Sequence, residues 1–476
     1  MKTNPLFPPA PPRISPYAID PNLLAERAGQ LPGMTGVALD DLFPGAPSPI
    51  SLASPETIRK QIREQTKKAL ANVDLSKIQP PDSVNILASH HGFNLYGGEA
   101  YAEMLRAIRD EVERRCHTDN INLCVGAGLR FREPDELIQK FSLDEYFRGK
   151  VCGMAPVDQG VPIKTDIGTF HGVRRAYSAR WIIHAHNSDV RELHYHRQIG
   201  RLFKPFAMSY ATIETRSLYH QSMGPRSANL IPRLIYESPL VQEKFACSVI
   251  LQMAPTGIIG VDAHNDLVEQ DKLFARRNIS WYGKIITLLS CLEDVILIVD
   301  YPNSIPYTTA CGILFCNFLN GNVDEFDLDI PFTPFTRYTD MLYPGPDPLY
   351  QGDLVPPPNP AIRALVINYC FKGYPGTFFA QQLPTFVVGP QADLLRGCVQ
   401  NTTFMDYAIE VEGLRKAVDF ARRITKTDNI LAFDGAVGGL NVSEALAERM
   451  LKLAPELALK IEGELMPKWL KQRGLL

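Results

Sequence analysis

Three residues with chemically active side chains follow one another at fixed intervals near the middle of the chain. They are His194, Lys204 ten residues later, and His220 sixteen residues after that. Histidine nitrogens bind metal ions, and a lysine amine can carry a cofactor covalently. Of the ten histidines in the chain, five lie between residues 184 and 220. This stretch is therefore the candidate metal or cofactor site.

A second pair of histidines, His184 and His186, ends the apolar run that begins at Trp181. Because side chains alternate along a strand, both rings are expected on the same face. Two imidazoles on one face could bind zinc in a hydrolase. Histidines also occur as ordinary core or surface residues, so a purely structural role stays open for this pair.

Length and composition limit the class of protein. A chain of 476 residues predicts two or three domains, and 45% hydrophobic with 21% charged residues is typical of a globular protein with a sizeable core. A formal charge of −3 and a pI near 6.4 favour a small-molecule ligand over nucleic acid or a membrane surface. The nine cysteines form no CxxC pair, and the N-terminus lacks a signal-peptide core, so we expect a cytoplasmic protein.

Strand and helix patterns alternate through the first half of the chain. The helix between the first two strands places apolar residues at i, i+3, i+4, i+7 and i+11, which indicates one buried face. This order predicts a parallel sheet flanked by helices. The expected strands are 84–88, 121–125, 180–186 and 245–253, and the expected helices are 55–71, the segment after Gly97-Gly98, and 133–141.

We predict three parts in the chain. Residues 1–60 begin with a proline-rich extended arm laid over the protein's own surface or over the partner subunit of a homodimer. Residues 61–275 form the catalytic domain, and residues 276–476 form a second α/β domain that begins near the Arg276-Arg277 pair. The predicted strands of this second domain are 295–299, 364–367, 385–388 and 430–433, with helices at 411–424 and 443–453.

The ends of the predicted strands locate a ligand site. Ligands of open parallel sheets bind outside the carboxyl ends of the strands. Three such ends are His90-His91-Gly92, the segment 126–130, and the link from His186 to His194. The fold class is therefore α/β, with two α/β domains, mainly parallel sheets and an active-site cleft between the domains that histidines line.

The intervals between His194, Lys204 and His220 resemble those of the nickel-pincer lactate racemase family of 2-hydroxyacid racemases. In that family a histidine in an E-x-H motif precedes the lysine of an S-G-G-R-K run by ten residues, and the histidine of N-H-S follows sixteen residues later. Here Gly200 and Arg201 begin the lysine run. The segments 86–93, 124–137 and 430–435 also resemble family motifs in the same order, so the likeness extends over most of residues 84–440.

The resemblance implies an isomerase, a racemase or epimerase of a 2-hydroxyacid or sugar-acid substrate. It implies a nickel-pincer nucleotide, a pyridinium thioamide and thiocarboxylic acid mononucleotide, tethered to Lys204 near Gly200 and Arg201. His220 and the group carried by Lys204 would hold nickel, and His194 would be a general base. Imidazole and sulfur donors suit nickel in a planar site, and an imidazole can take and return a proton near neutral pH.

Two departures from the family concern the second acid/base group and the substrate carboxylate. The family's other histidine falls at Leu129, and the aspartate and arginine of its first loop fall at Ser89 and Gly92. We hypothesise that His90 or His91 supplies the second base and that Arg130 holds a carboxylate through a bidentate pair. These departures favour a substrate other than lactate. A non-catalytic homologue of the same fold and a histidine-ligated metal hydrolase are the alternatives.

Overall fold

The computed structural model describes residues 26–50, 54–93, 97–128, 131–188, 202–221, 230–301, 318, 326–329, 358–370, 377–397 and 403–476. The chain divides into two compact units. The described residues of 48–189 and 198–275 form the six-stranded unit, and those of 1–47 and 276–476 form the seven-stranded unit, each named after its main sheet. No helix among the described residues combines the length and the apolar character needed to cross a membrane.

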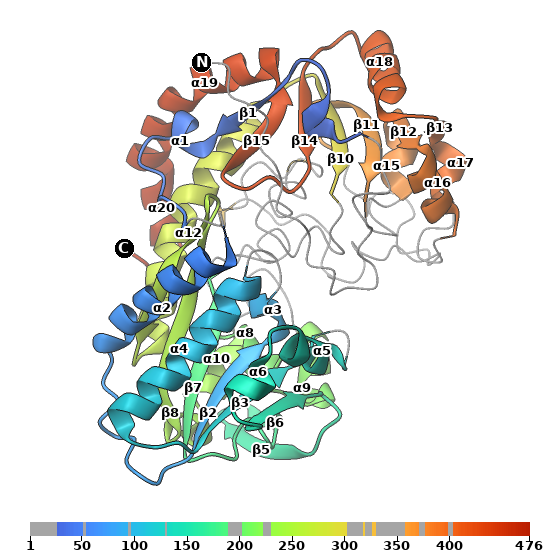
Figure 1. The fold of residues 1–476 in the computed structure, drawn as a ribbon. Helices are drawn as coiled ribbons and strands as arrows, with labels where there is room; N and C mark the ends of the chain where they lie inside the picture. Colours follow the sequence, from blue (N-terminus) through green and yellow to red (C-terminus); the bar gives the residue numbers. More distant parts are fainter. Residues whose placement is uncertain are drawn as a thin grey trace. The chain divides into compact units, whose positions relative to one another are not determined.

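The six-stranded unit is built around a sheet in the order β4-β3-β2-β7-β8-β9 (Figure 1). Its first five strands are parallel, and β9 is antiparallel to β8. The strands are β2 (Val84–Ser89), β3 (Ile121–Gly126), β4 (Val151–Met154), β7 (Trp181–Asn187), β8 (Phe245–Ala254) and β9 (Gly257–His264), and a separate hairpin joins β5 (Gly160–Thr165) to β6 (Gly168–Val173). The helices are α2 (Pro55–Ala71), α3 (His90–Phe93), α4 (Gly98–Cys116), α5 (Glu133–Lys140), α6 (Leu143–Tyr146), α8 (Lys204–Ala207), α9 (Ile213–Gln221), α10 (Leu230–Glu237) and α11 (Pro239–Gln242).

The seven-stranded unit has the strand order β1-β15-β14-β10-β11-β12-β13. Strands β14, β10, β11, β12 and β13 are parallel. Strand β15 is antiparallel to β14, and β1 is antiparallel to β15. The strands are β1 (Met34–Ala38), β10 (Val295–Asp300), β11 (Ile362–Tyr369), β12 (Thr385–Val388), β13 (Ile409–Val411), β14 (Ile430–Phe433) and β15 (Gly439–Ser443). The helices are a 3₁₀ turn (Ala28–Gln30), α1 (Leu39–Leu42), α15 (Thr377–Gln382), α16 (Gly389–Arg396), α17 (Phe404–Tyr407), α18 (Leu414–Thr425), α19 (Glu444–Lys460), a π-helical turn (Ile461–Leu465) and α20 (Met466–Lys471).

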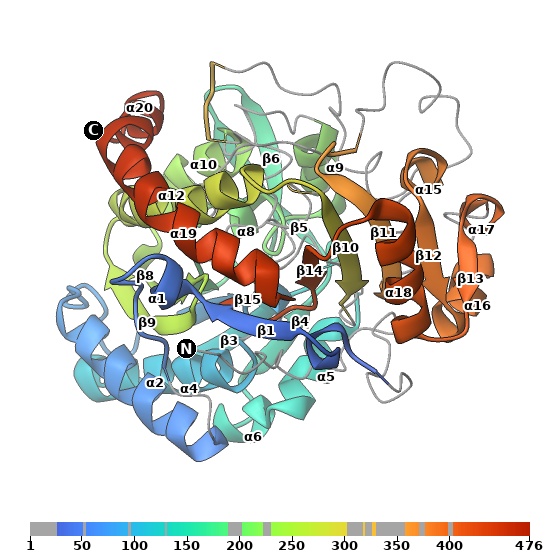
Figure 2. The ribbon, with the colours of Figure 1, turned by 90° about the horizontal axis from the view of Figure 1, so that it is seen from above.

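Burial explains why the central strands of both sheets form as they do. Every residue of β2, β7 and β10 is buried, as expected for parallel strands covered on both faces. In the six-stranded unit α2 and α4 lie side by side (Figure 1). In the seven-stranded unit α18 packs on β10, β11 and β12, and α19 runs beside β1 and β15 (Figure 2). The predicted α/β fold with two mainly parallel sheets is confirmed, and the predicted cleft between the domains stays a prediction.

Helix α2 shows how local sequence sets an element's bounds. The Ser54 side chain accepts a hydrogen bond from the Thr57 amide, and Pro55 occupies the first turn, where its missing N–H costs nothing. The predicted range of 55–71 agrees with the helix as observed. The five apolar residues predicted to form one face of α4 are all fully buried: Tyr101, Met104, Leu105, Ile108 and Val112.

One region differs from the local predictions. Within the predicted arm, Met34–Ala38 forms β1, which pairs with β15 at the edge of the seven-stranded sheet. The predicted domain boundary at Arg276-Arg277 lies within helix α12, which runs from Leu267 to Ser290, and stays a prediction. The two arginines lie on its exposed side, while Ala275 and Ile279 are buried at helical spacing.

Candidate functional site

Histidine side chains gather at the carboxyl edge of the six-stranded sheet. His90 and His91 follow β2 directly, and their ring centroids lie 3.7 Å apart. On the neighbouring strand β7, His186 Nδ1 lies 3.3 Å from Ser89 Oγ. The side chain of Asn187 donates a hydrogen bond of 3.2 Å to the backbone oxygen of His91. The structure therefore brings the ends of β2 and β7 together, as expected for neighbouring parallel strands.

The loop after β3 reaches the same cluster at Gly128. A Cβ atom at this position would lie 2.0 Å from His90 Nε2, so the ring fits only because residue 128 is glycine. His90 is 5% exposed, whereas His91 is half-buried. His90 thus lies between the ends of β2 and β3, and His91 is the more accessible of the two rings.

The variant Gly128→Ala is expected to displace the ring of His90 and to lower the free energy of unfolding by about 1–3 kcal/mol, because an added methyl group overfills this space. Urea unfolding and the NMR resonances of the His90 ring would measure both effects. Gly389→Ala is the control, since nothing lies within 4 Å of its added Cβ. Unchanged His90 resonances in Gly128→Ala would contradict the packing described here.

His184 belongs to the interior of the unit and is fully buried. Its Nε2 atom lies 3.0 Å from the backbone oxygen of Leu202, and its Nδ1 atom lies 3.0 Å from the hydroxyl of Tyr210. Burial lowers the pKa of His184 to about 3, against the opposing effect of the Leu202 carbonyl. Both ring nitrogens thus contact groups of the chain's own interior.

This environment gives no support to a zinc site at His184 and His186. A metal ligand needs a lone pair directed at the ion, and the His184 nitrogens face a carbonyl and a tyrosine hydroxyl instead. Across the part of the chain that the structure describes, no group of three or more His, Cys, Asp or Glu side chains is placed to hold a metal ion. We infer a structural role for His184.

Lys204 is the first residue of α8 and is only 5% exposed. The backbone of Leu202, two residues before Lys204, makes hydrogen bonds through both its N–H group and its oxygen. The Leu202 N–H donates a hydrogen bond of 3.1 Å to Asp271, and the Leu202 oxygen contacts His184. Burial raises the pKa of Asp271 to about 6, and the Leu202 N–H opposes this rise. Because lysine is rarely buried so deeply, this side chain is an unusual feature of the unit.

Helix α9 is joined to the loop after β3 by Arg216. Its guanidinium donates hydrogen bonds to the backbone oxygens of Ala127 and Gly128, at 2.9 and 3.1 Å. It also donates to Met208, at 2.6 Å, and to Ala211, at 3.2 Å. Arg216 is 5% exposed, and burial lowers its pKa to about 10. The arginine therefore connects the segment that carries Lys204 to the loop that packs on His90.

His220 lies one helical turn after Arg216 and is exposed. Its Nδ1 atom donates a hydrogen bond of 2.8 Å to the Arg216 backbone oxygen. A backbone acceptor at one ring nitrogen fixes the tautomer in which Nε2 carries the lone pair, which is the arrangement typical of a metal-binding histidine. The local geometry of His220 is therefore compatible with the predicted metal ligand.

Several predicted site residues lie outside the described residues. They are His194, Gly200, Arg201, Arg130 and the neighbouring Leu129. Their roles stay predictions.

Three residues that position the site were not predicted from the sequence: Tyr210, Arg216 and Asp271. Their partners are remote, since Tyr210 bonds the Leu87 oxygen 123 residues away and Arg216 bonds Ala127 89 residues away. No local sequence pattern predicts hydrogen bonds between residues so far apart, because these bonds depend on which strands become neighbours.

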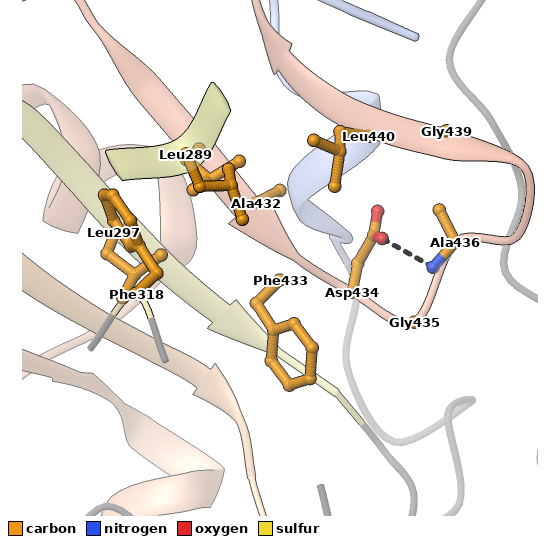
Figure 3. A pocket seen from close by; sticks show the side chains of 11 residues that line it. Leu289, Leu297, Phe318, Ala432, Phe433, Asp434, Gly435, Ala436, Gly439 and Leu440 are labelled. Carbon is orange, nitrogen blue, oxygen red and sulfur yellow. Dashed lines mark hydrogen bonds between the residues drawn. The ribbon is translucent and has the colours of Figure 1, made fainter. Parts of the chain in front are cut away.

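A second group of polar residues lies at the carboxyl edge of the seven-stranded sheet. Asp434 follows β14 and accepts hydrogen bonds from Ala436 N, at 2.9 Å, and Asn441 Nδ2, at 2.6 Å. It borders an apolar cavity of about 30 Å³ (Figure 3). Burial raises the pKa of Asp434 to about 6, and the charge of Asp300 adds to this. Asp300 is itself paired with Arg27 at 3.0 Å. These carboxylates have partners within the unit, and the cavity has room for about one water molecule.

A larger hollow of about 780 Å³ lies on the six-stranded unit between residues of α2, α4 and α6. Its arginines are committed to carboxylates: Arg63 bonds Glu103 and Asp110, both at 2.6 Å, and Arg106 bonds Glu103 at 3.0 Å. None of the histidines described above lines this hollow. It is therefore distinct from the histidine cluster.

Among solved structures, the chain is similar to the lactate racemase apoprotein from Thermoanaerobacterium thermosaccharolyticum, with 12% sequence identity and a TM-score of 0.47. The similarity covers 84% of this chain and 95% of that chain. No protein-family model matches the chain, and no curated protein matches it. A similarity at this level does not assign a function.

Proposed function

We propose that the protein is a racemase or epimerase of a 2-hydroxyacid or sugar-acid substrate that carries a nickel-pincer nucleotide on Lys204. The observation that carries the proposal is the buried Lys204, 5% exposed, held in the unit whose sheet edge gathers His90, His91 and His186. The intervals from His194 to Lys204 and from Lys204 to His220 in the sequence support the same assignment.

The described residues fit such a group by their donor chemistry. Lys204 offers an amine for a thioamide link, in surroundings that exclude most solvent. His220 offers Nε2 as a ligand, with Nδ1 committed to the Arg216 oxygen. Nickel(II) accepts imidazole and sulfur donors of this kind. When bound, the cofactor would supply an electron-poor ring that takes up and returns a hydride.

The chain itself would supply the proton chemistry. One neutral imidazole would take the proton of the substrate hydroxyl, and an imidazole on the other side of the substrate would return a proton to the same oxygen. His194 is the proposed base on one side, and His91 or His90 the proposed base on the other. His91 is favoured over His90 because it is the more accessible ring. Arg130 is proposed to hold the substrate carboxylate.

Peptide mapping of the intact protein tests this proposal. Protein made in a host that carries the cofactor-assembly enzymes is expected to show a nicotinate-derived adduct on Lys204 and about one nickel per chain. Lys204→Arg is expected to abolish the adduct, and His220→Ala to lower nickel content while leaving the adduct in place.

The matched controls are Lys244→Arg and His171→Ala. Lys244 is a partly buried lysine of the same unit that donates to the Ala179 oxygen, and His171 is an exposed histidine on β6. Both variants are expected to load as the wild type does. An unmodified Lys204 under conditions that load a known racemase would overturn the proposal and favour a non-catalytic homologue, whereas zinc in place of nickel would favour the hydrolase alternative.

A further inference from the structure

Two cysteines face each other on neighbouring strands of the six-stranded unit. Cys124 on β3 is the register partner of Cys152 on β4, and their Sγ atoms lie 3.5 Å apart. The two cysteines are not joined by a disulfide bond. Strand β4 is at the edge of the sheet, so Cys152 is half-buried while Cys124 is 2% exposed. Cys152 is therefore the more accessible of the two cysteines to a reagent in solvent, and the sulfur of the buried Cys124 is next to it.

The surroundings make the two thiols unequal. The hydrogen bond between them lowers the pKa of Cys152 and raises that of Cys124. The guanidinium of Arg175 lowers the pKa of Cys152 further, against the opposing effects of burial and of the Asp158 carboxylate. Burial adds to the rise for Cys124, whose Sγ also lies 3.9 Å from the Arg175 oxygen. Because a thiolate is the reactive form of cysteine, Cys152 is the nucleophile of the pair.

We propose that Cys152 and Cys124 form a reversible redox pair, in which Cys152 reacts with a hydroperoxide and Cys124 then closes a disulfide. No part of this proposal depends on the cofactor or on the racemase activity proposed above. The site is a modification site on the edge of the sheet, and its substrate class is a small hydroperoxide such as hydrogen peroxide.

The chemistry balances in two steps. The Cys152 thiolate attacks one peroxide oxygen, the O–O bond breaks, and the other oxygen leaves as hydroxide, which takes up a proton to become water. Cys152 is then a sulfenic acid. The Cys124 sulfur attacks the Cys152 sulfur, the S–O bond breaks, and the hydroxyl group leaves with the Cys124 proton as a second water. Two thiols lose two electrons, and the peroxide gains them.

Strand geometry allows the second step. The sulfur atoms must approach by about 1.5 Å to reach a bond length of about 2.05 Å. Strand β4 has only four residues and pairs on one side with β3, so a small shift of this edge strand can close the distance. The cross-link would lie two residues before Gly126 and Met154, which are themselves register partners. It would thus constrain the strand that leads to Gly128 and the His90 ring.

Treatment of the wild-type protein with hydrogen peroxide, followed by non-reducing peptide mapping, tests the proposal. The expected result is a linked pair of peptides that contain Cys124 and Cys152, a loss of two thiols per chain, and full recovery of both thiols with dithiothreitol. Recovery of Cys152 as a sulfinic or sulfonic acid while Cys124 remains a thiol would overturn it, and so would earlier oxidation of another cysteine.

Variants separate the two roles. Cys124→Ser is expected to stop the reaction at a sulfenic acid on Cys152, which dimedone traps, whereas Cys152→Ser is expected to leave Cys124 unreacted. Cys291→Ser is the matched control, because Cys291 is also half-buried, and it is expected to form the cross-link as the wild type does. Should the Cys124 or the Cys152 variant fail to fold, peptide mapping of the wild type tests the proposal by itself. Oxidation of Cys124 in Cys152→Ser as fast as in the wild type would refute the assignment of Cys152 as the residue that reacts first.

Discussion

Replacing Arg216 by methionine is expected to lower the free energy of unfolding of the six-stranded unit by about 2–4 kcal/mol, because four backbone oxygens lose a charged donor. These oxygens belong to the loop after β3 and to the turn between α8 and α9. Burial lowers the pKa of Arg216 to about 10, because removing the guanidinium from water disfavours its charged form. Removing the charge therefore recovers part of the loss and keeps the expected effect below that of four separate hydrogen bonds.

Urea unfolding followed by hydrogen exchange in peptides of β2 and β3 would measure this loss. Arg216→Lys is expected to lower the free energy of unfolding by an intermediate amount. A lysine keeps the charge but lacks the planar guanidinium that reaches four acceptors. Arg233→Met is the control. Arg233 is exposed on α10 and pairs with Glu237 at 2.8 Å, a surface ion pair worth less than about 1 kcal/mol. An Arg216→Met protein as stable as this control would show that the four contacts do not hold the loop.

Strands and helices with a strong local pattern could be predicted from the sequence. Elements that form only by pairing with a remote segment could not. Strands β2, β3 and β7 are short, mainly apolar runs, and α4 repeats its apolar positions at helical spacing, so local residues suffice to define them. By contrast β1 has five small or apolar residues, and it becomes a strand by pairing with β15. Its partner lies about 400 residues away, beyond any local signal.

The candidate site divides in the same way. The sequence places His90, His91 and His186 at strand ends, and the parallel order of β2 and β7 then brings them to one edge. The sequence does not distinguish His184 from His186, although they are two residues apart on the same strand. What separates them is the set of neighbours: His184 meets Tyr210 and Leu202, whereas His186 meets Ser89. Only the tertiary structure supplies these neighbours.

The role of the glycines at 126 and 128 also could not be predicted from the sequence. The Gly126-Ala127-Gly128 turn is weak as a phosphate-binding signal in the sequence, because it lacks the third glycine of a dinucleotide motif. The structure gives both glycines a packing role. A Cβ at Gly126 would lie 2.2 Å from the Ser209 backbone oxygen, and one at Gly128 would meet the His90 ring. The turn is glycine-rich because two other segments approach its backbone closely.

The wild-type protein is expected to lose stability relative to His184→Gln as the pH falls below 6.5. The pKa of His184 is lowered from 6.5 to about 3 by burial, so between these values the unfolded chain binds a proton that the folded chain does not. Each pH unit in this window costs about 1.4 kcal/mol, which gives a loss of about 2 kcal/mol at pH 5. Glutamine keeps polar atoms near Leu202 and Tyr210 but does not titrate. The loss of stability caused by His184 therefore reaches its full size only below pH 3, where the folded chain binds the proton as well.

The difference between wild type and variant, measured by urea unfolding from pH 4 to pH 8, is the quantity that isolates His184. Asp271 and Asp434, whose pKa values are raised to about 6, act in the opposite direction. Their protonated forms favour folding, and this contribution is lost as the pH rises through 6. The two effects oppose each other in the raw stability curve, but the contribution of the two aspartates is common to both proteins and cancels in the difference curve. His171→Gln, at an exposed histidine, is the control and is expected to leave the pH dependence unchanged.

A difference between wild type and His184→Gln that shows no loss below pH 6.5 would have a definite structural meaning. The three contacts among His184, Tyr210 and the backbone oxygens of Leu87 and Leu202 span 2.9 to 3.0 Å. A neutral imidazole and one hydroxyl supply two protons for these three contacts, whereas an imidazolium supplies the third. A curve that is flat below pH 6.5 and falls as the pH rises above 6.5 would therefore show that hydrogen bonding outweighs burial and that the folded protein holds His184 as a buried cation. A slope of about 1.4 kcal/mol per pH unit below pH 6.5 would show that desolvation dominates, and that one of the three contacts lacks a proton at neutral pH.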